Sequence, residues 1–389
     1  MSGHGDSLAY DFRTAVDATW VEPRLNRVHG GDVEAWARSA GIQAGEILDF
    51  SASINPLGPP PSARKVFIKS YGEISRYPPS YGEKLKEALA EHHGMSAAEV
   101  LVGNGSTQLI YLLCAALRPR KALIVGPAFS EYANALALAG ADIRQFTLGT
   151  DDGFQFSTQR FMAAWDKDCN IVFLPTPNSV TGQLISRVEI EKIADAALKR
   201  KCFIVVDEAF IDFVEKESVK ALARHNAYLM VLRSLTKYYA LPGLRLGYLL
   251  GEAHRVAQLA AYQEPWSVNA PALSVALACL KDSGFTMKTA RWLEWERKFL
   301  FERLEALEGF RPFASKTNFL LVKIERKAGD ALRLRSFLIR RKILVRAGDS
   351  FAGVGDNYFR IAVKRRRDNR CLLRALEEWT TSSIGSFHG

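Results

Sequence analysis

The stretch Cys202-Phe203-Ile204-Val205-Val206-Asp207 is continuously apolar up to its last residue. An unbroken apolar run of this length is typical of a strand buried on both faces of a mainly parallel sheet. Similar runs occur at 100–103, 121–126, 170–175, 228–232 and 246–250. Segments long enough for crossover helices separate them, at 107–117, 131–139 and 188–200. Repeated units of this kind predict an α/β domain whose mainly parallel sheet is flanked by helices.

The flanking regions follow different patterns. Residues 83–93 place apolar side chains on one helical stripe, and Gly94 is a suitable helix terminator. Downstream, the sequence predicts a smaller α+β domain from a long amphipathic helix at 286–308, strands at 317–324 and 358–363, and a helix at 330–341.

Composition narrows the class of protein. The chain has 389 residues, 48% of them hydrophobic and 24% charged, with a formal net charge of +10. Such an excess suits nucleic acid, a membrane surface or a small anionic substrate. The basic residues are spread along the chain apart from the run at 364–367, which we interpret first as a solvated face. We therefore expect a small-molecule partner, with neither nucleic acid nor a membrane.

The cysteines and the N-terminal region bear on the compartment. The five cysteines are far apart and form no CxxC pair, which argues against a disulfide framework or a zinc site. Residues 1–28 contain four acidic residues and no unbroken apolar core, unlike a secretory signal. No apolar run reaches the roughly 20 residues that a bilayer-spanning helix needs. We expect a cytoplasmic protein without a bound metal.

The clearest candidate for chemistry is Lys237, in the segment Arg233-Ser-Leu-Thr-Lys237. A lysine just after an apolar strand lies at the mouth of a sheet, where α/β sites are found. Its amine forms an imine with a cofactor aldehyde if burial or nearby cations lower its pKa. Ser234 and Arg245 are suited to holding a phosphate. The same spacing also suits an exposed lysine and a surface arginine.

Asp207 strengthens the first interpretation. It ends a buried strand, and an unpaired buried charge is costly, so the carboxylate needs a partner. A protonated pyridine nitrogen would be such a partner and would keep the ring an electron sink. A helix cap or a pair with a local lysine is the alternative.

A glycine-rich turn lies between the first apolar run and the following helix. Gly105, Ser106 and Thr107 offer backbone amides and two hydroxyls, which together could cradle a phosphate. Glycine turns before helices are common, so this motif is weak alone. Phe129 could stack on a flat ring, although a single phenylalanine is usually part of a core.

In this order the elements resemble the fold-type I pyridoxal-phosphate enzymes, the aspartate aminotransferase superfamily, from about residue 29 to about residue 380. The resemblance implies the cofactor pyridoxal 5'-phosphate, with Lys237 as the Schiff-base lysine and Asp207 on the pyridine nitrogen. It also implies a homodimer in which Tyr77 reaches the neighbouring cofactor phosphate. Arg360 matches the arginine that grips the substrate carboxylate, a bidentate contact. We place an N-terminal extension at 1–28, a small domain at 29–75 and 281–389, and a large cofactor-binding domain at 76–280.

Within the superfamily, several segments resemble threonine-phosphate decarboxylases of cobalamin biosynthesis, themselves similar to histidinol-phosphate aminotransferases. The segments include the His-Gly-Gly at 29–31 and the Pro-Trp-Ser-Val-Asn at 265–269. Aminotransferases usually have tyrosine at the position of Phe210, so phenylalanine favours the decarboxylases. A phosphorylated side chain needs a second anion site, for which His29, Asn55 and Arg346 are the candidates.

The loop at 177–182 departs from the family pattern. The family usually has Pro-Asn-Asn-Pro-Thr-Gly, whereas this chain has Asn178 followed by Ser179 and Val180. The second asparagine normally bonds the ring oxygen of the cofactor, and Phe210 also lacks the usual hydroxyl. Ser179 or Asn178 would then have to replace these donors.

Three functions follow from these observations. The first is a decarboxylase that acts on threonine phosphate or serine phosphate. The second is an aminotransferase for histidinol phosphate or a similar amino acid. The third is a non-catalytic regulator that binds nucleic acid through its basic surface, which the retention of Lys237 disfavours.

Overall fold

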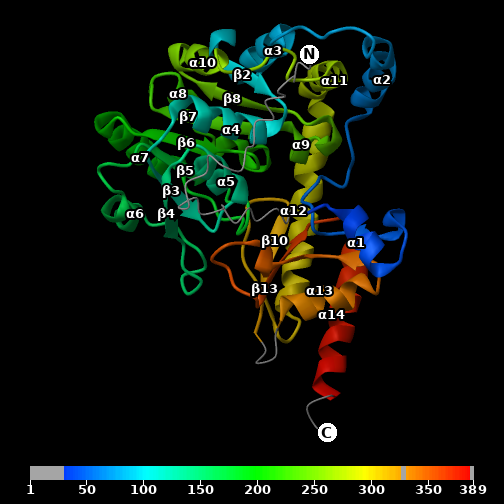
Figure 1. Ribbon diagram of the computed structural model, residues 1–389. Helices are drawn as coiled ribbons and strands as arrows, with labels where there is room; N and C mark the ends of the chain where they lie inside the picture. The colour runs from blue at the N-terminus through cyan, green and yellow to red at the C-terminus, as the bar shows by residue number, and fades with distance from the viewer. Residues whose placement is uncertain (1–29, 326–329, 386–389) are drawn as a thin grey trace, which may run out of the picture.

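The computed structural model describes residues 30–325 and 330–385. The backbone forms two parts, one above the other in the view of Figure 1. The upper part contains a seven-stranded sheet, and the lower part contains a four-stranded and a two-stranded sheet. The fold is thus an α/β fold with a smaller α+β part, as the sequence predicts.

The seven-stranded sheet is mainly parallel. Its strand order is β2-β8-β7-β6-β5-β3-β4, and only β8 runs antiparallel to its neighbours. Six of these strands, all but β4, have interiors that are buried throughout, because helices cover both faces. The strands are β2 (Val100–Gly103), β3 (Lys121–Gly126), β4 (Asp142–Thr147), β5 (Ile171–Pro175), β6 (Phe203–Asp207), β7 (Leu229–Ser234) and β8 (Gly247–Gly251).

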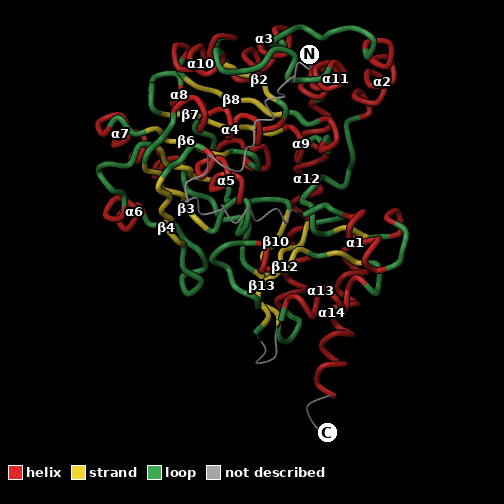
Figure 2. The backbone as a smooth tube through the Cα atoms, in the orientation of Figure 1, coloured by secondary structure: helices red, strands yellow, loops and turns green. Residues whose placement is uncertain are grey.

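Helices lie on both sides of this sheet, as Figure 2 shows. Side chains of α4, α5 and α10 form one apolar core with one face, and those of α3, α7 and α11 form a second core with the other. The α-helices are α1 (Val33–Ala40), α2 (Pro61–Ser70), α3 (Glu83–His93), α4 (Gly105–Leu117), α5 (Ser130–Leu138), α6 (Thr158–Ala164), α7 (Arg187–Arg200), α8 (Lys220–Ala223), α9 (Leu235–Tyr238), α10 (Ala253–Ala260), α11 (Ala270–Leu280), α12 (Ser283–Glu305), α13 (Ala331–Ile339) and α14 (Arg366–Gly385).

Local sequence explains where these helices begin and end. The α7 helix begins at a capping box, in which Ser186 and Glu189 each bond the other's backbone amide. The α3 helix ends at Gly94, which has a left-handed φ of 65° and bonds two carbonyls of the last turn. Short 3₁₀ segments complete the connections, at Ala44–Glu46, Tyr71–Glu73, Ala97–Glu99, Ile211–Glu217, Pro242–Leu244 and Gly348–Ser350.

The smaller part is built on antiparallel strands. Its four-stranded sheet has the order β12-β13-β10-β9, and α12, α13 and α14 contribute to the core beside it. A parallel pair, β1 with β11, joins the N-terminal region to this part. The strands are β1 (Leu48–Asp49), β9 (Phe310–Pro312), β10 (Phe319–Ile324), β11 (Ile343–Leu344), β12 (Arg346–Ala347) and β13 (Tyr358–Ala362).

The connection between the two parts involves the long helix α12 (Figure 1). It begins beside α11 and contributes side chains to both cores, with Phe285 in one and Leu300 in the other. The segment before residue 75 also contacts both parts. Its helix α2 packs on α11 of the larger part, whereas the sequence analysis places residues 29–75 in the small domain. The division at residues 75 and 281 therefore stays a proposal. In the part of the chain that the structure describes, no helix is long and apolar enough to span a bilayer.

Candidate active site

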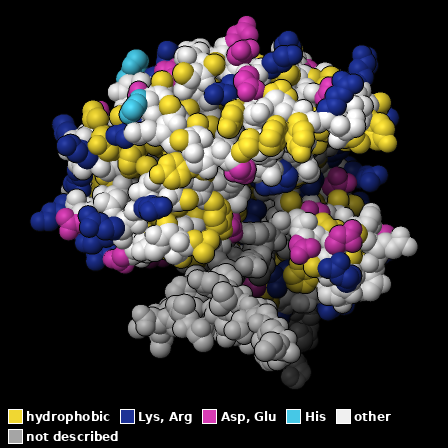
Figure 3. Space-filling view, turned by 45° about the horizontal axis from the view of Figure 1, so that its top comes forward, with side chains coloured by type: hydrophobic (Ala, Val, Ile, Leu, Met, Phe, Trp, Pro, Cys, Tyr) yellow, Lys and Arg dark blue, Asp and Glu magenta, His cyan; other side chains and the backbone are white. Residues whose placement is uncertain are grey.

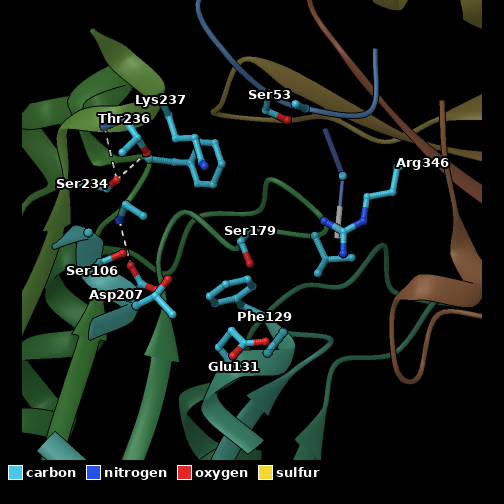
Figure 4. A pocket seen from close by; sticks show the side chains of 18 of the residues that line it. Ser53, Ser106, Phe129, Glu131, Ser179, Asp207, Ser234, Thr236, Lys237 and Arg346 are labelled. Atoms are coloured by element: carbon cyan, nitrogen blue, oxygen red, sulfur yellow. Dashed lines mark hydrogen bonds between the residues drawn. The ribbon is translucent and has the colours of Figure 1, made fainter. Parts of the chain in front are cut away.

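A cavity of about 410 Å³ opens at the carboxyl ends of the strands, where the two parts of the molecule meet (Figure 4). Open α/β sheets hold their ligands at this edge. Twelve of the residues that the sequence predicts for the site line this cavity: Gly105, Ser106, Thr107, Phe129, Ser179, Asp207, Phe210, Ser234, Lys237, Arg245, Arg346 and Arg360.

Lys237 lies on the short helix α9, directly after β7. Its loss of water and the nearby Arg245 and Arg360 cations lower the pKa of its amine to about 8. Asp207 acts in the opposite direction but does not cancel this effect. The amine is therefore neutral much more often near neutral pH than that of an ordinary lysine, and a neutral amine is the form that attacks an aldehyde.

Asp207 ends β6 and is 6% exposed. Its Oδ1 accepts a hydrogen bond of 2.9 Å from the backbone N–H of Ala209, and its Oδ2 accepts one from the Tyr132 hydroxyl. Burial raises the pKa of the Asp207 carboxyl, although both hydrogen bonds oppose the rise. A cation in the cavity next to this carboxyl would favour its ionised form.

The start of α4 and the end of β7 form one end of the cavity. Gly105 has a φ of +76°, and a Cβ there would lie 2.8 Å from the Arg245 guanidinium. The Ser234 and Thr236 hydroxyls are 2.8 Å apart, and Figure 4 shows Ser106 beside them. Free backbone amides of a first helical turn, hydroxyls and a guanidinium together make a site for a phosphate.

Next to the phosphate-binding end, the cavity has room for a flat ring beside Phe129. In Figure 4 the Phe129 ring and the Ser179 side chain point toward the same space. The Ser179 Oγ is buried and has no hydrogen-bond partner within the described residues. A buried hydroxyl without a partner is costly, so a ligand atom that bonds it would be favoured.

Two arginines of the smaller part face the other side of the cavity. Arg360, on β13, is 6% exposed and lies between the rings of Phe319 and Phe351, at 4.7 and 5.2 Å. Burial and the nearby Arg346 cation hold the pKa of the Arg360 guanidinium well below its usual value. Burial lowers the pKa of Arg346 to about 10.

The acceptors of Arg360 are backbone carbonyls. Its guanidinium donates to the Ser179 carbonyl and, at 3.3 Å, to the Ser51 carbonyl. Its Nε has no partner, and no acidic side chain of the described residues forms an ion pair with it. Buried charges are usually paired, so this arginine is suited to an anionic ligand.

Three further predicted residues, Asn178, Asn55 and Tyr77, do not line this cavity. The Asn178 side chain donates to the Pro127 carbonyl and accepts from the backbone amides of Val180 and Thr181, so both of its polar atoms bond the protein itself. Asn55 is buried and donates to the Tyr238 carbonyl and the Thr289 hydroxyl. Tyr77 is 82% exposed and lines a separate cavity. His29 lies outside the described residues.

Several lining residues were not predicted. Thr236 follows Ser234 by two residues. A second hydroxyl in the Ser-Leu-Thr-Lys segment could have identified it from the sequence. Ser53 lines the cavity with a buried Oγ that lacks a partner among the described residues. Glu131 also lines it, held by the Tyr111 hydroxyl at 2.6 Å and by the Asn134 amide at 2.9 Å. Nothing in the sequence distinguishes Glu131 from a surface residue at a helix start.

Together these groups fit pyridoxal phosphate. The cavity offers an amine with a lowered pKa, a buried carboxylate and a phosphate cradle that a Cβ at Gly105 would obstruct. The Ser179 hydroxyl, which has no hydrogen-bond partner among the residues that the structure describes, offers a further donor. No group of three or more metal-ligating side chains occurs in residues 30–325 and 330–385.

Comparisons with known proteins agree with this assignment. Residues 45–376 match the family described as Aminotransferase class I and II. The chain is 39% identical over 360 residues to threonine-phosphate decarboxylase of Salmonella typhimurium strain LT2, covering 92% of this chain and 98% of the relative.

Two solved structures are also similar to this fold. The L-threonine-O-3-phosphate decarboxylase from Porphyromonas gingivalis has a TM-score of 0.76 at 25% identity, with 85% of this chain and 99% of that chain covered. The histidinol-phosphate aminotransferase from Clostridium acetobutylicum has a TM-score of 0.80 at 27% identity, with 86% and 99% covered. The chain therefore belongs to the aminotransferase class I and II family of pyridoxal-phosphate-dependent enzymes.

Proposed function

We propose that the enzyme decarboxylates L-threonine O-3-phosphate, or its serine analogue, to (R)-1-amino-2-propanol O-2-phosphate or the corresponding product. Such a reaction would serve cobalamin biosynthesis. The observation that carries the proposal is the pair of guanidinium groups, Arg346 and Arg360, that face one cavity from the smaller part. A substrate with two anionic groups, a carboxylate and a phosphate, matches two cations better than a substrate with one.

Arg360 is the candidate for the carboxylate. Its guanidinium is buried, and its acceptors are neutral carbonyls, so a carboxylate would supply the missing charge. Its position on β13, across the cavity from Lys237, would set the direction of the carboxylate. That direction decides which bond at Cα breaks.

Arg346 and Ser53 are candidates for the phosphate of the side chain. Arg346 donates through its Nε to the Ser350 hydroxyl at 3.0 Å, which orients the guanidinium. Ser53 presents a buried hydroxyl to the same cavity. In Figure 4 the Arg346 side chain extends into the cavity from the side opposite Lys237.

Pyridoxal phosphate, when bound, supplies a ring that takes up the negative charge left at Cα. Asp207 would keep a carboxylate at the inner end of the cavity, and its hydrogen bond from Tyr132 holds it there. Lys237 would hold a proton at Nζ and return it to Cα, which a pKa of about 8 permits near neutral pH. Phe210 and Val180 close the cavity with apolar side chains and exclude water.

Two further properties belong to the proposal. The first is a homodimer, in which Tyr77 reaches the cofactor phosphate of the neighbouring subunit. The exposed position of Tyr77, whose ring centroid lies 4.7 Å from that of Trp266, supports this. The second is a cytoplasmic location, with a phosphorylated amino acid as the partner rather than nucleic acid or a membrane.

The test is to incubate the cofactor-loaded enzyme separately with threonine phosphate, serine phosphate and histidinol phosphate, the last with 2-oxoglutarate. We expect carbon dioxide and an amino alcohol phosphate from the first or second compound. Glutamate formation from histidinol phosphate, without carbon dioxide from the others, would instead make the protein an aminotransferase. Consumption of none of the three would contradict both substrate assignments.

A further inference from the structure

Beneath the cavity lies a buried cluster of charges centred on Arg233. This residue precedes Ser234 on β7 and is 1% exposed. Its Nη1 donates to Glu208 at 2.8 Å, and its Nη2 donates to Asp212 at 3.3 Å and to Glu215 at 2.6 Å. One cation thus joins three acids that come from a single segment after β6.

The cluster lies on the opposite face of the sheet from the cavity. Asp207 and Ser234 line the cavity, whereas Glu208 and Arg233 do not. Side chains of a strand point alternately to the two faces, which accounts for the difference. The ion pair between Glu208 and Arg233 therefore joins the ends of β6 and β7 directly behind the two residues that face the cofactor.

Glu208 also anchors the chain that follows it. Its carboxylate accepts hydrogen bonds from the Val219 backbone and the Ser218 hydroxyl, both at 2.7 Å. Its own N–H donates to the Leu232 carbonyl at 2.8 Å. Residues 209–210, which directly follow the anchored Glu208, form part of the cavity wall. Any movement of the cluster would be transmitted to this wall.

Stability alone does not account for such a cluster. Well-packed apolar side chains replace buried ion pairs at little or no cost in stability in many proteins, because desolvation offsets the attraction. What the cluster provides is a defined separation between two strand ends. The groups that need this separation are Asp207 at one end and Lys237, three residues after Ser234, at the other.

We propose that Arg233 is a positioning residue, whose ion pairs with Glu208, Asp212 and Glu215 hold Asp207 and Lys237 at the separation that pyridoxal phosphate requires. The inference rests on cofactor binding and not on the identity of the substrate. It therefore goes beyond the proposed function and can fail or succeed independently of it.

The experiment measures cofactor binding without any substrate. Apoprotein of the wild type and of Arg233→Met, Arg233→Lys and Arg224→Met is titrated with pyridoxal phosphate, and the visible circular dichroism per bound cofactor is recorded. Arg224 is the matched control, since it pairs with Glu99 at 3.1 Å and does not line the cavity. Urea unfolding of each apoprotein reports its stability separately.

We expect Arg233→Met to bind the cofactor on the order of tenfold more weakly, because Asp207 and Lys237 would no longer be held at a fixed separation. The circular dichroism per bound cofactor should also fall, because the ring is held less firmly. Arg233→Lys should recover part of both signals, and Arg224→Met should keep wild-type values. A folded Arg233→Met protein with unchanged affinity and unchanged circular dichroism would overturn the proposal.

A second variant covers the case in which Arg233→Met does not fold. Glu215 has a side chain that is 40% exposed, so Glu215→Gln removes one partner at the edge of the cluster. It should weaken cofactor binding in the same direction by a smaller factor. Wild-type affinity and circular dichroism in a folded Glu215→Gln protein, with Arg233→Met unfolded, would leave a structural role only and overturn the proposal.

Discussion

The charge of Lys237 follows from its surroundings rather than from its residue type. Burial and two neighbouring guanidinium groups lower the pKa of its amine to about 8. The amine is protonated below this pH and becomes neutral as the pH rises through it. The neutral form is the nucleophile, so the pH determines how fast the lysine combines with an aldehyde.

We therefore predict the pH dependence of cofactor capture. When pyridoxal phosphate is added to apoprotein, the rate at which visible absorbance appears should rise between pH 6 and about 8 and then level off. Lys199→Ala, which changes an exposed lysine on α7, should give the same profile. A rate that continues to rise to pH 10 would indicate an ordinary lysine pKa and contradict the structure.

A second prediction concerns the guanidinium of Arg360. Arg360→Lys keeps the positive charge but loses the planar fork that binds a carboxylate through two bonds. We expect kcat/KM for threonine phosphate to fall by about 10- to 100-fold, as for a lost charge-assisted hydrogen bond. Arg297→Lys is the control, because Arg297 donates to the Thr317 carbonyl at 3.1 Å outside the cavity. Equal kcat/KM for the wild type and Arg360→Lys would exclude Arg360 from carboxylate binding.

The residues that sequence reasoning missed depend on contacts between distant segments. Tyr132 bonds Asp207, which is 75 positions away, because β3 and β6 flank β5 in the sheet and α5 follows β3. Glu131 faces the cavity for the same reason. Strand order determines both contacts, and no local pattern reveals it. Asn55, a predicted substrate-binding residue, donates hydrogen bonds to the Tyr238 carbonyl and the Thr289 hydroxyl, two contacts that no local pattern reveals.

At the scale of secondary-structure elements, strand β8 lies very close to the start of helix α4. A Cβ at Gly247 would lie 2.3 Å from the Ser106 amide nitrogen and 2.7 Å from the Gly105 carbonyl carbon. Only glycine allows the strand to lie this near the helix start that forms the phosphate cradle. The position of α4 relative to the sheet thus depends on one missing side chain.

Gly247→Ala should therefore disturb both stability and the cradle. We expect a loss of about 1–3 kcal/mol in the free energy of unfolding, as for overpacking, together with weaker cofactor binding. Gly243→Ala is the matched control, because a Cβ there meets nothing within 4 Å. Chemical denaturation and cofactor titration of the two variants provide the measurement. Equal behaviour of the two variants would show that α4 can shift without consequence.

The fold was predictable where strands are buried on both faces. All six continuous apolar runs correspond to strands of the large sheet. Two have the same ends as their strands, and the ends of the other four differ by at most two residues. The seventh strand, β4, was missed because it lies at the sheet edge and all six of its residues are exposed or half-buried. Strands of two or three residues in the smaller part, such as β9 and β11, are too short to produce a pattern.

At the scale of the whole molecule, the surface around α2 exposes several large apolar side chains. Figure 3 shows hydrophobic side chains gathered over this upper region. Patches of this kind mark contacts with other molecules. Exposed apolar side chains of this region include Phe67, Ile68, Tyr71, Ile74, Tyr77 and Trp266.

If this surface joins two subunits, charge placed on it should separate them. We predict that wild-type protein sediments with twice the 43.3 kDa mass of one chain, and that Ile68→Glu with Ile74→Glu lowers this mass to that of one chain. Val188→Glu, at a 59% exposed position on α7, should leave the mass unchanged. An unaltered mass in the double variant would place the subunit contact elsewhere.

The cations that surround the cavity also influence molecules before they bind. Lys237, Arg245, Arg346 and Arg360 outnumber the two acids, Asp207 and Glu131, on the cavity wall. A recess with an excess of one charge focuses the electric field and speeds the diffusional encounter with oppositely charged solutes. The association rate constant of pyridoxal phosphate with the apoprotein should consequently decline as ionic strength increases. Stopped-flow measurements in 0.02–0.5 M salt, over which the Debye length changes about fivefold, would reveal this decline. Uncharged analogues should show no such decline.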